Sequence, residues 1–493
     1  MKIVLSLLFI FFVASPILIQ AVEFNLTSCW PFTDSGTTAL LNSPKKVFAH
    51  YFSLFPISID NKVSTDDYYT NNFLKPTGEG GKHLQYGGFI RERPLPRPVR
   101  PDMSTYRDLD MQLEVTRALS LGLDGFTYDM LSSDETSDHW KRLILLMKNA
   151  PIVDSRFKIV LMPDMLAGWS NTANIADTFV PIIKKLWDSP YNGTLLRDST
   201  GKLVLSPYRA DSKTGAWWQN QITKFNQVGI QISFWPVFPD INQNYLNNYG
   251  SISVGQSEWD GNCVSTAPGF VTASNFLHNN GKKYMSPVMS QNHRPKSYKF
   301  WEANNSGAIR AMWNSAIVSG AEWIQIITWN DYSEGTELSP STGTQFSYYD
   351  ISAYYLRWYK LGQAPVINRD ALYYFHRNSL STQQPDLTKQ NRTFTSGACD
   401  PVSDKVEALV FLTGAATVEI IQNGQTYSTP VNAAGITSVR TQLLAGATPR
   451  FRVIRGTNVI IDITSSFPVA TSVVYQDLLY RGGGSLTCTR PSV

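Results

Sequence analysis

The sequence predicts an α/β fold, a (β/α)8 TIM barrel followed by a small antiparallel β-sandwich. Three observations support this prediction. Between residues 45 and 362, eight short apolar runs alternate with segments of helical period, as strands and helices do in a barrel. No Gly-x-Gly-x-x-Gly turn follows the first run, although an open doubly wound sheet would need such a ligand loop. Beyond residue 370 the runs become β-rich and are separated by turn residues.

The predicted barrel strands are short and almost continuously apolar, which is typical of parallel strands covered by helices. They are Val47–Phe52, Asp124–Asp129, Lys158–Pro163, Leu203–Pro207, Ile230–Trp235, Ile252–Gln256, Lys283–Met289 and Trp323–Trp329. Helical periodicity is clearest in Tyr106–Gly122, Asp138–Ala150, Thr172–Trp187 and Phe300–Ser319. The first two strands are separated by residues 53–123, and so long a connection predicts one wall of a cleft.

The C-terminal β-sandwich is predicted from six β-rich runs. They are Ala408–Leu412, Thr417–Gln422, Gln425–Thr429, Arg450–Ile454, Asn458–Ile463 and Ser472–Asp477. Turns are expected at Asn423-Gly424, the strongest local hairpin signal, and at Arg455-Gly456. The predicted division is a signal peptide at 1–21, an N-terminal segment at 22–44, a catalytic barrel at 45–393 and the sandwich at 394–493.

The N-terminus has the pattern of a secretory signal. A basic start at Lys2 precedes an apolar run from Ile3 to Ile19, and the small residue Ala21 follows. An uncleaved membrane anchor is the alternative, and Pro16 near the end of the run favours cleavage. We therefore expect a secreted, extracellular protein with no membrane attachment after cleavage.

Four cysteines in a secreted chain predict two disulfides, for which three pairings exist. We favour Cys399 with Cys488, because they bracket the terminal segment, and hence Cys29 with Cys263. No cysteine lies in a Cys-x-x-Cys pattern or a Cys/His cluster, so we expect no metal and no cofactor.

The composition favours a neutral, hydroxyl-rich ligand. Charged residues make up 17% of the chain, against about 25% in typical proteins. Aromatic residues are plentiful, with 13 Trp, 23 Tyr and 25 Phe. The net charge is only +4 and no run of Lys or Arg is present, which excludes nucleic acid as an expected partner. A polysaccharide substrate and a monomeric enzyme are the expectation.

Active sites of barrels lie on the loops that follow the carboxyl ends of the strands. That rule selects carboxylates, amides and aromatic side chains, the groups that compose a sugar-binding cleft. The candidates for substrate binding are His50, Tyr51, Tyr128, Asp129, Asp164, Trp235, Glu258, Trp259, Gln291, His293, Trp329 and Asn330.

Asp331 and Glu334 are the candidate catalytic pair. Glycosidic cleavage uses two carboxyl groups, one protonated to donate to the leaving oxygen and one to activate water or attack the sugar. The two residues follow the last predicted strand directly, in a segment rich in aromatic and amide side chains. Ordinary surface acids are the alternative interpretation of this pair. Asp129 and Asp164 are rivals for the proton chemistry, although we expect them to bind sugar.

The segment Trp323–Glu334 carries the most specific resemblance to a known family. Together with Lys46–Tyr51, Gly122–Phe126 and Lys158–Met165, it resembles glycoside hydrolase family 71, the α-1,3-glucanases, over residues 45–380. The resemblance implies that Asp331 and Glu334 are the acid–base pair of an inverting enzyme with a barrel and a following β-sandwich. The segments 87–94 and 286–293 depart from the better-known fungal members, as in a divergent branch.

The expected function is endo-hydrolysis of α-1,3-glucan, with two alternatives. Endo-α-mannosidases share a motif, Trp-Asn-x-x-x-Glu-Gly-Thr, that Trp329-Asn330 and Glu334-Gly335-Thr336 satisfy, while Asp331 stands where those enzymes carry Glu. An α-mannan or another α-glycan is therefore an alternative substrate. A secreted glycan-binding protein without turnover is the second alternative, and the retention of both carboxylates argues against it.

Overall fold

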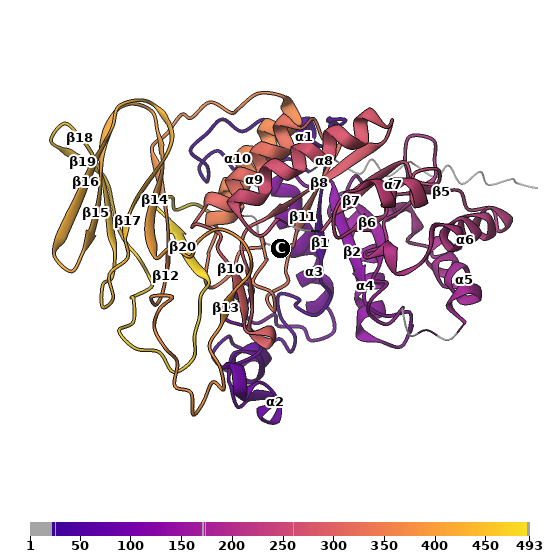
Figure 1. Ribbon diagram of the computed structural model, residues 1–493, viewed down its shortest axis with the longest axis horizontal. Helices are drawn as coiled ribbons and strands as arrows, with labels where there is room; N and C mark the ends of the chain where they lie inside the picture. The colour runs from indigo at the N-terminus through magenta and orange to yellow at the C-terminus, as the bar shows by residue number, and fades with distance from the viewer. Residues whose placement is uncertain (1–21, 25, 170–171, 173, 260, 491–493) are drawn as a thin grey trace, which may run out of the picture.

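The computed structural model describes residues 22–24, 26–169, 172, 174–259 and 261–490. The predicted signal peptide, residues 1–21, lies outside the described residues. Figure 1 shows the barrel, drawn from indigo to orange, beside the strands of the C-terminal sandwich in orange and yellow. None of the described helices is long and apolar enough to cross a membrane.

A parallel barrel forms the N-terminal part, as predicted. Its sheet has the strand order β5-β4-β3-β2-β1-β11-β8-β7-β6. The strands are β1 (Lys46–Tyr51), β2 (Gly125–Met130), β3 (Lys158–Pro163), β4 (Leu203–Leu205), β5 (Ile232–Phe234), β6 (Val237–Phe238), β7 (Gly255–Glu258), β8 (Lys283–Met289) and β11 (Trp323–Ile327).

The two ends of that sheet, β5 and β6, are halves of one strand. Only Trp235 and Pro236 separate them, and Pro236 has no N–H to offer a ladder. The first half pairs with β4 and the second with β7, so this interrupted strand closes the barrel. The eight predicted strands therefore correspond to the eight positions of a closed barrel.

Two predicted elements are displaced. The strand expected at 252–256 is β7, because Ile252 still belongs to the turn that ends α7 (Gln243–Tyr249). The helix expected at 300–319 begins only at α9 (Gly307–Val318), since Asn304 and Asn305 have φ values of 57° and 61°, which an α-helix excludes. Its first residues instead form β10 (Lys299–Trp301).

Helices cover the barrel and pack its outward-facing side chains. They are α3 (Tyr106–Leu121), α4 (Asp138–Val153), α5 (Ile175–Trp187), α6 (Gly215–Gln227), α7, α8 (Ala267–Asn279), α9 and α10 (Ser347–Leu361). Two short helices, α1 (Thr37–Asn42) and α2 (Gly78–Gly81), precede α3. A separate apolar cluster that includes Phe48, Val160 and Met162 fills the inside of the barrel, where the rings of Trp235 and Trp323 stack 4.0 Å apart.

The long connection between β1 and α3 has a core of its own. Phe55, Tyr69, Phe73 and Ile90 pack together with Tyr332 from the segment that follows β11. Buried Arg93 and Asp67 form an ion pair within the same connection. These contacts hold the connection against the carboxyl end of the barrel, so it forms a wall there.

The C-terminal part is a sandwich of two four-stranded antiparallel sheets, ordered β17-β14-β12-β20 and β16-β15-β18-β19, around a shared apolar core. The strands are β12 (Ala371–Arg377), β14 (Lys405–Leu412), β15 (Ala416–Gln422), β16 (Gln425–Val431), β17 (Gly435–Gln442), β18 (Arg450–Arg455), β19 (Asn458–Thr464) and β20 (Tyr480–Gly484). The first of them precedes residue 394, and the run at 472–477 forms no strand. The Asn423-Gly424 hairpin is confirmed, with both residues at positive φ.

A third, small sheet lies between barrel and sandwich (Figure 1). It joins β9 (Asn292–Arg294), β10 and β13 (Thr395–Ser396) in the order β13-β10-β9. Its strand β9 follows β8 of the barrel, whereas β13 belongs to the segment that leads into the sandwich. The small sheet thus connects the rim of the barrel to the C-terminal region.

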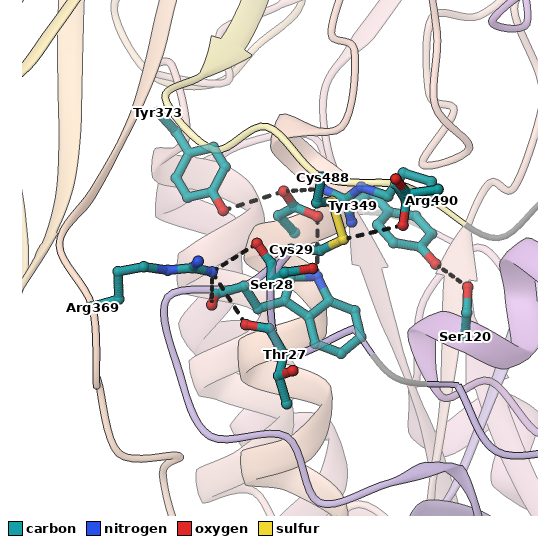
Figure 2. Close-up of a disulfide and its surroundings, with 12 residues drawn as sticks. Thr27, Ser28, Cys29, Ser120, Tyr349, Arg369, Tyr373, Cys488 and Arg490 are labelled. Atoms are coloured by element: carbon teal, nitrogen blue, oxygen red, sulfur yellow. Dashed lines mark hydrogen bonds and ion pairs between the residues drawn. A yellow bond between two sulfur atoms is a disulfide. The ribbon is translucent and has the colours of Figure 1, made fainter.

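The predicted disulfide pairing was wrong. The bonds join Cys29 to Cys488 and Cys263 to Cys399, with Cα atoms 5.2 Å and 6.0 Å apart. After β20 the chain passes α10, where Arg490 pairs with Asp350 at 2.8 Å, and Cys488 bonds to Cys29 of the N-terminal segment (Figure 2). The terminal segment is therefore tied to the start of the chain, and bracketing in sequence did not identify neighbours in space.

Peptide mapping without reduction tests this pairing. We expect one linked pair of peptides that carries Cys29 and Cys488 and a second that carries Cys263 and Cys399, because only these cysteines have adjacent Cα atoms. Mass spectrometry of the digest identifies both pairs. A linked pair containing Cys399 and Cys488 would contradict the fold of the terminal segment.

Candidate active site

A polar pocket of about 110 Å³ opens at the carboxyl ends of the barrel strands. Side chains on or after seven of the eight barrel strands converge on it, including four carboxylates. The pocket is lined by His50, Phe52, Asp129, Asp164, Tyr208, Trp259, Arg294, Asp331 and Glu334. The strand alternation explains the convergence, because Phe48 and Val160 point into the barrel and every second residue beyond them does the same.

Asp331 is fixed in the turn that follows β11. Its Oδ1 accepts hydrogen bonds from the backbone N–H of Ser333 at 2.9 Å, from the hydroxyl of Ser333 at 2.6 Å and from the N–H of Glu334 at 3.2 Å. The N–H of Asp331 donates to Thr328 Oγ1 at 2.8 Å. Gly335 completes the turn at φ 61°, where a Cβ would also come within 2.6 Å of Leu479.

Glu334 is held in place by an ion pair with Arg294. Arg294 Nη2 lies 2.8 Å from Glu334 Oε2, and Arg294 Nε donates to Asn292 Oδ1 at 3.0 Å. The backbone of Glu334 is tied as well, since its carbonyl accepts a 2.7 Å hydrogen bond from the N–H of His293. This carboxylate therefore has a defined place at the pocket edge.

His50, Asp129 and Asp164 form the pocket floor. His50 Nε2 lies 3.5 Å from Asp129 Oδ2, and the carboxylate of Asp164 accepts the N–H groups of Leu166 and Ala167 at 2.8 Å and 3.1 Å. His50 Nδ1 and Asp129 Oδ1 are buried without a protein partner in the described structure. Buried polar atoms need partners, so these two atoms are suited to the hydroxyls of a bound ligand.

Burial and mutual repulsion oppose the ionisation of all four carboxylates together. Burial and the charge of Asp331 raise the pKa of Glu334 to about 7, against the pull of Arg294. Burial and the charge of Asp129 raise the pKa of Asp164 to about 6. Burial also raises the pKa of Asp129. The pocket therefore holds carboxyl groups that keep their protons to higher pH than isolated carboxyls do.

Aromatic rings complete the pocket. The ring of Trp259 meets those of His50 and Tyr208 edge-on, each at 4.7 Å between centroids. Rings of this kind present apolar faces beside polar tips, which matches the alternation of C–H faces and hydroxyls on a sugar.

Six of the predicted site residues line the pocket, namely His50, Asp129, Asp164, Trp259, Asp331 and Glu334. Trp329 and Asn330 lie beside it and support it. Trp329 Nε1 donates to buried Glu114 Oε2 at 2.7 Å. The Asn330 amide accepts the Phe52 N–H at 2.7 Å and donates to the Phe52 and Phe55 carbonyls at 2.9 Å and 3.0 Å, which fastens the wall formed by the long connection.

The other predicted residues lie elsewhere. Tyr51 and Tyr128 stack together outside the barrel sheet, because they alternate with inward-facing positions. Trp235 belongs to the apolar barrel interior, and Glu258 accepts the hydroxyl of Tyr284. Gln291 bonds both backbone groups of Tyr480 in β20, while His293 stacks on Phe394.

Sequence reasoning missed Phe52, Tyr208 and Arg294. Tyr208 follows β4 by three residues, so the rule of strand carboxyl ends contained the signal for it. Arg294 is one residue beyond His293 in β9, and alternation turns it to the opposite face. Among the described residues, no three His, Cys, Asp or Glu side chains are arranged to hold a metal ion.

Comparisons with known proteins identify the family. The chain belongs to glycosyl hydrolase family 71, whose model matches residues 100–479. A glucan endo-1,3-alpha-glucosidase of Schizosaccharomyces pombe is 25% identical over 75% of this chain and 89% of its own length. An ascus wall endo-1,3-alpha-glucanase of the same yeast is 22% identical over 72% and 88%. The chain is accordingly a glycoside hydrolase.

Solved structures support the barrel. The GH99 endo-alpha-mannosidase from Bacteroides thetaiotaomicron aligns with a TM-score of 0.50 and 14% identity over 64% of this chain and 98% of its own. At this identity the likeness concerns the fold alone.

Replacing Asn330 by Ala tests the support of the pocket wall. The change leaves the buried N–H of Phe52 without its acceptor, so we expect the free energy of unfolding to fall by about 1–3 kcal/mol. Asn248→Ala is the matched control, because the Asn248 amide is exposed and bonds only within its own helix. Urea unfolding of both variants measures the difference. Equal stability of the two variants would show that Asn330 does not fasten the wall.

Proposed function

We propose that this protein is a secreted, endo-acting enzyme that hydrolyses α-1,3-glucosidic bonds of glucan with inversion. Glu334 is the general acid and Asp331 the general base. The observation that carries the proposal is the convergence of both carboxylates on one buried pocket at the mouth of a family 71 barrel. The names of the two yeast relatives support the substrate.

The two carboxylates have different surroundings, and this difference supports their roles. Burial raises the pKa of Asp331, and three donors at one oxygen oppose that rise by stabilising its ionised form, the form that a base needs to activate water. The resulting charge raises the pKa of Glu334 to about 7, so this group still carries a proton near neutral pH. Pairs of carboxyl groups in unequal surroundings are typical of acid–base catalysis in glycosidases.

The remaining pocket groups fit a neutral sugar. The free acceptor of Asp129 and the unpaired nitrogen of His50 would bind hydroxyls of the glucosyl unit whose anomeric carbon reacts. Trp259 would cover a face of that ring. Two disulfides agree with an oxidising, extracellular location for a polymer-degrading enzyme.

An α-mannan is the second candidate substrate. Trp329-Asn330 and Glu334-Gly335-Thr336 satisfy the motif of endo-α-mannosidases, although Asp331 differs from it. Asn330 supports the turn and Gly335 completes it, whichever substrate is bound. The motif is therefore explained by the structure of the turn and does not discriminate between glucan and mannan.

Incubation with insoluble α-1,3-glucan tests the function and the catalytic pair together. We expect the wild type to release soluble gluco-oligosaccharides. In Asp331→Asn and Glu334→Gln the rate of release should fall by about 10²–10⁴-fold, the usual contribution of acid–base groups. Chromatography of the supernatant measures the release.

Three outcomes would contradict parts of this account. Activity within a few-fold of wild type in either variant would remove that residue from the chemistry. Release from α-mannan alone would replace the substrate. Binding of glucan by the wild type without any release would support a glycan-binding protein instead.

The pH profile of Arg294→Met tests which carboxyl is the acid. Arg294 lowers the pKa of Glu334, so its removal raises that pKa further. A general acid acts only while protonated, and the alkaline limb of kcat/KM should therefore move to higher pH. Arg294 lies over the ring of Trp301, 5.1 Å from its centroid. Arg197→Met is the matched control, because Arg197 lies over the ring of Trp187 in the same way but outside the pocket. Movement of the acidic limb instead would make Glu334 the base.

A further inference from the structure

The small sheet at the barrel rim has two different faces. In the antiparallel pair of β9 and β10, His293 lies opposite Phe300, and both are buried with Phe394. Alternation places Arg294 and Trp301 on the other face of the same sheet. Because Arg294 lines the pocket and pairs with Glu334, this face borders the catalytic pair.

Trp301 is held in a fixed orientation on that face. The guanidinium of Arg294 lies over its ring, 5.1 Å from the centroid. Gly397 supports the edge of the indole so closely that a Cβ there would come within 2.1 Å of Trp301 Nε1. Trp301 nevertheless keeps part of its surface exposed to solvent. An ordered, partly exposed tryptophan beside a catalytic pocket is a ready surface for a sugar ring.

The small sheet is also locked to the barrel. β13 pairs with β10, and Cys399 shortly after it is bonded to Cys263, which follows the Trp259 segment. Asn292 in β9 donates to Asn262 at 2.6 Å, which adds a second link to the same barrel loop. The wall that carries Trp301 is therefore rigidly related to the rim on which the pocket is built.

Arg294 connects Glu334 to Trp301. Its guanidinium pairs with the Glu334 carboxylate at 2.8 Å and lies over the Trp301 ring at 5.1 Å from the centroid. His50, Asp129 and Asp164 line the pocket with Glu334, whereas Trp301 is not among the residues that line it. A general acid stands next to the oxygen that leaves, so the sugar on the leaving-group side lies close to the acid. Trp301 and Arg294 are near Glu334 and outside the group formed by His50, Asp129 and Asp164.

We propose that Trp301 and Arg294 form the subsite for the neutral glucosyl unit on the leaving-group side of the scissile bond. The open part of the indole packs against the C–H face of the pyranose, and the guanidinium of Arg294 donates to its hydroxyls. This inference rests on the proposed function, because it takes Glu334 as the acid. It adds a binding site built by the small sheet to the pocket of the barrel.

A comparison of two substrates tests the subsite. A defined α-1,3-linked gluco-oligosaccharide needs a sugar on the leaving-group side, whereas the α-fluoride of an α-1,3-linked glucobiose leaves only fluoride there. We expect Trp301→Ala to lower kcat/KM for the oligosaccharide at least roughly tenfold more than for the fluoride, a difference of about 1.4 kcal/mol. Trp187→Ala removes another tryptophan that an arginine covers, outside the pocket, and should leave kcat/KM unchanged for both substrates.

Gly397→Ala is a second variant that keeps the indole but displaces it. The added Cβ collides with Trp301 Nε1, so we expect the same substrate-dependent loss in a smaller amount. Calorimetric titration of Glu334→Gln with the oligosaccharide, with and without Trp301→Ala, gives a readout independent of turnover. Weaker binding in the double variant is expected.

Equal losses on both substrates, or none on either, would overturn the subsite while leaving the proposed function intact. Unchanged affinity of the double variant would overturn it as well. If the wild type hydrolyses neither substrate, the proposed function itself fails. The two failures are therefore distinguishable within one set of measurements.

Discussion

Burial of several carboxylates at one end of the barrel is the constraint on which the site depends. Inward-facing positions of parallel strands meet at the carboxyl end, and here they bring Asp129 and Asp164 beside Asp331 and Glu334. Charges removed from water repel strongly, so the group retains protons that isolated carboxyls would lose. The raised pKa of Glu334 follows from this crowding, and Arg294 limits how far it rises.

The C-terminal sandwich contributes to the position of the catalytic turn. Leu479 contacts the turn at Gly335, and Gln291, two residues after β8, bonds the backbone of Tyr480. On the other side, Asn330 fastens the turn to the connection that follows β1. The turn is thus held between two walls that are distant in sequence. This accounts for a second domain packed on the barrel rim, independently of any role in binding polymer.

The sequence predicted the barrel and the pocket centre, because both depend on local periodicity and on the rule that sites follow strand ends. It predicted His50 and Asp129 through that rule, yet it also selected Tyr51 and Tyr128, since alternation was not used to separate inward from outward positions. Arg294 depends on the small sheet, in which β10 pairs with β13 (Lys299 opposite Thr395), a contact between segments distant in sequence that leaves no local pattern. The disulfide pairing depends on the same kind of distant contact.

Direct titration of Glu334 tests the central claim most closely. Carbon NMR of the protein with labelled glutamate side chains, with Glu334→Gln to assign the signal, gives the pKa of this one carboxyl. We expect a value of about 7, well above the ordinary 4.5 of a glutamate. A value at or below 4.5 would contradict the account, because a carboxyl that is ionised throughout the neutral range cannot protonate the leaving oxygen.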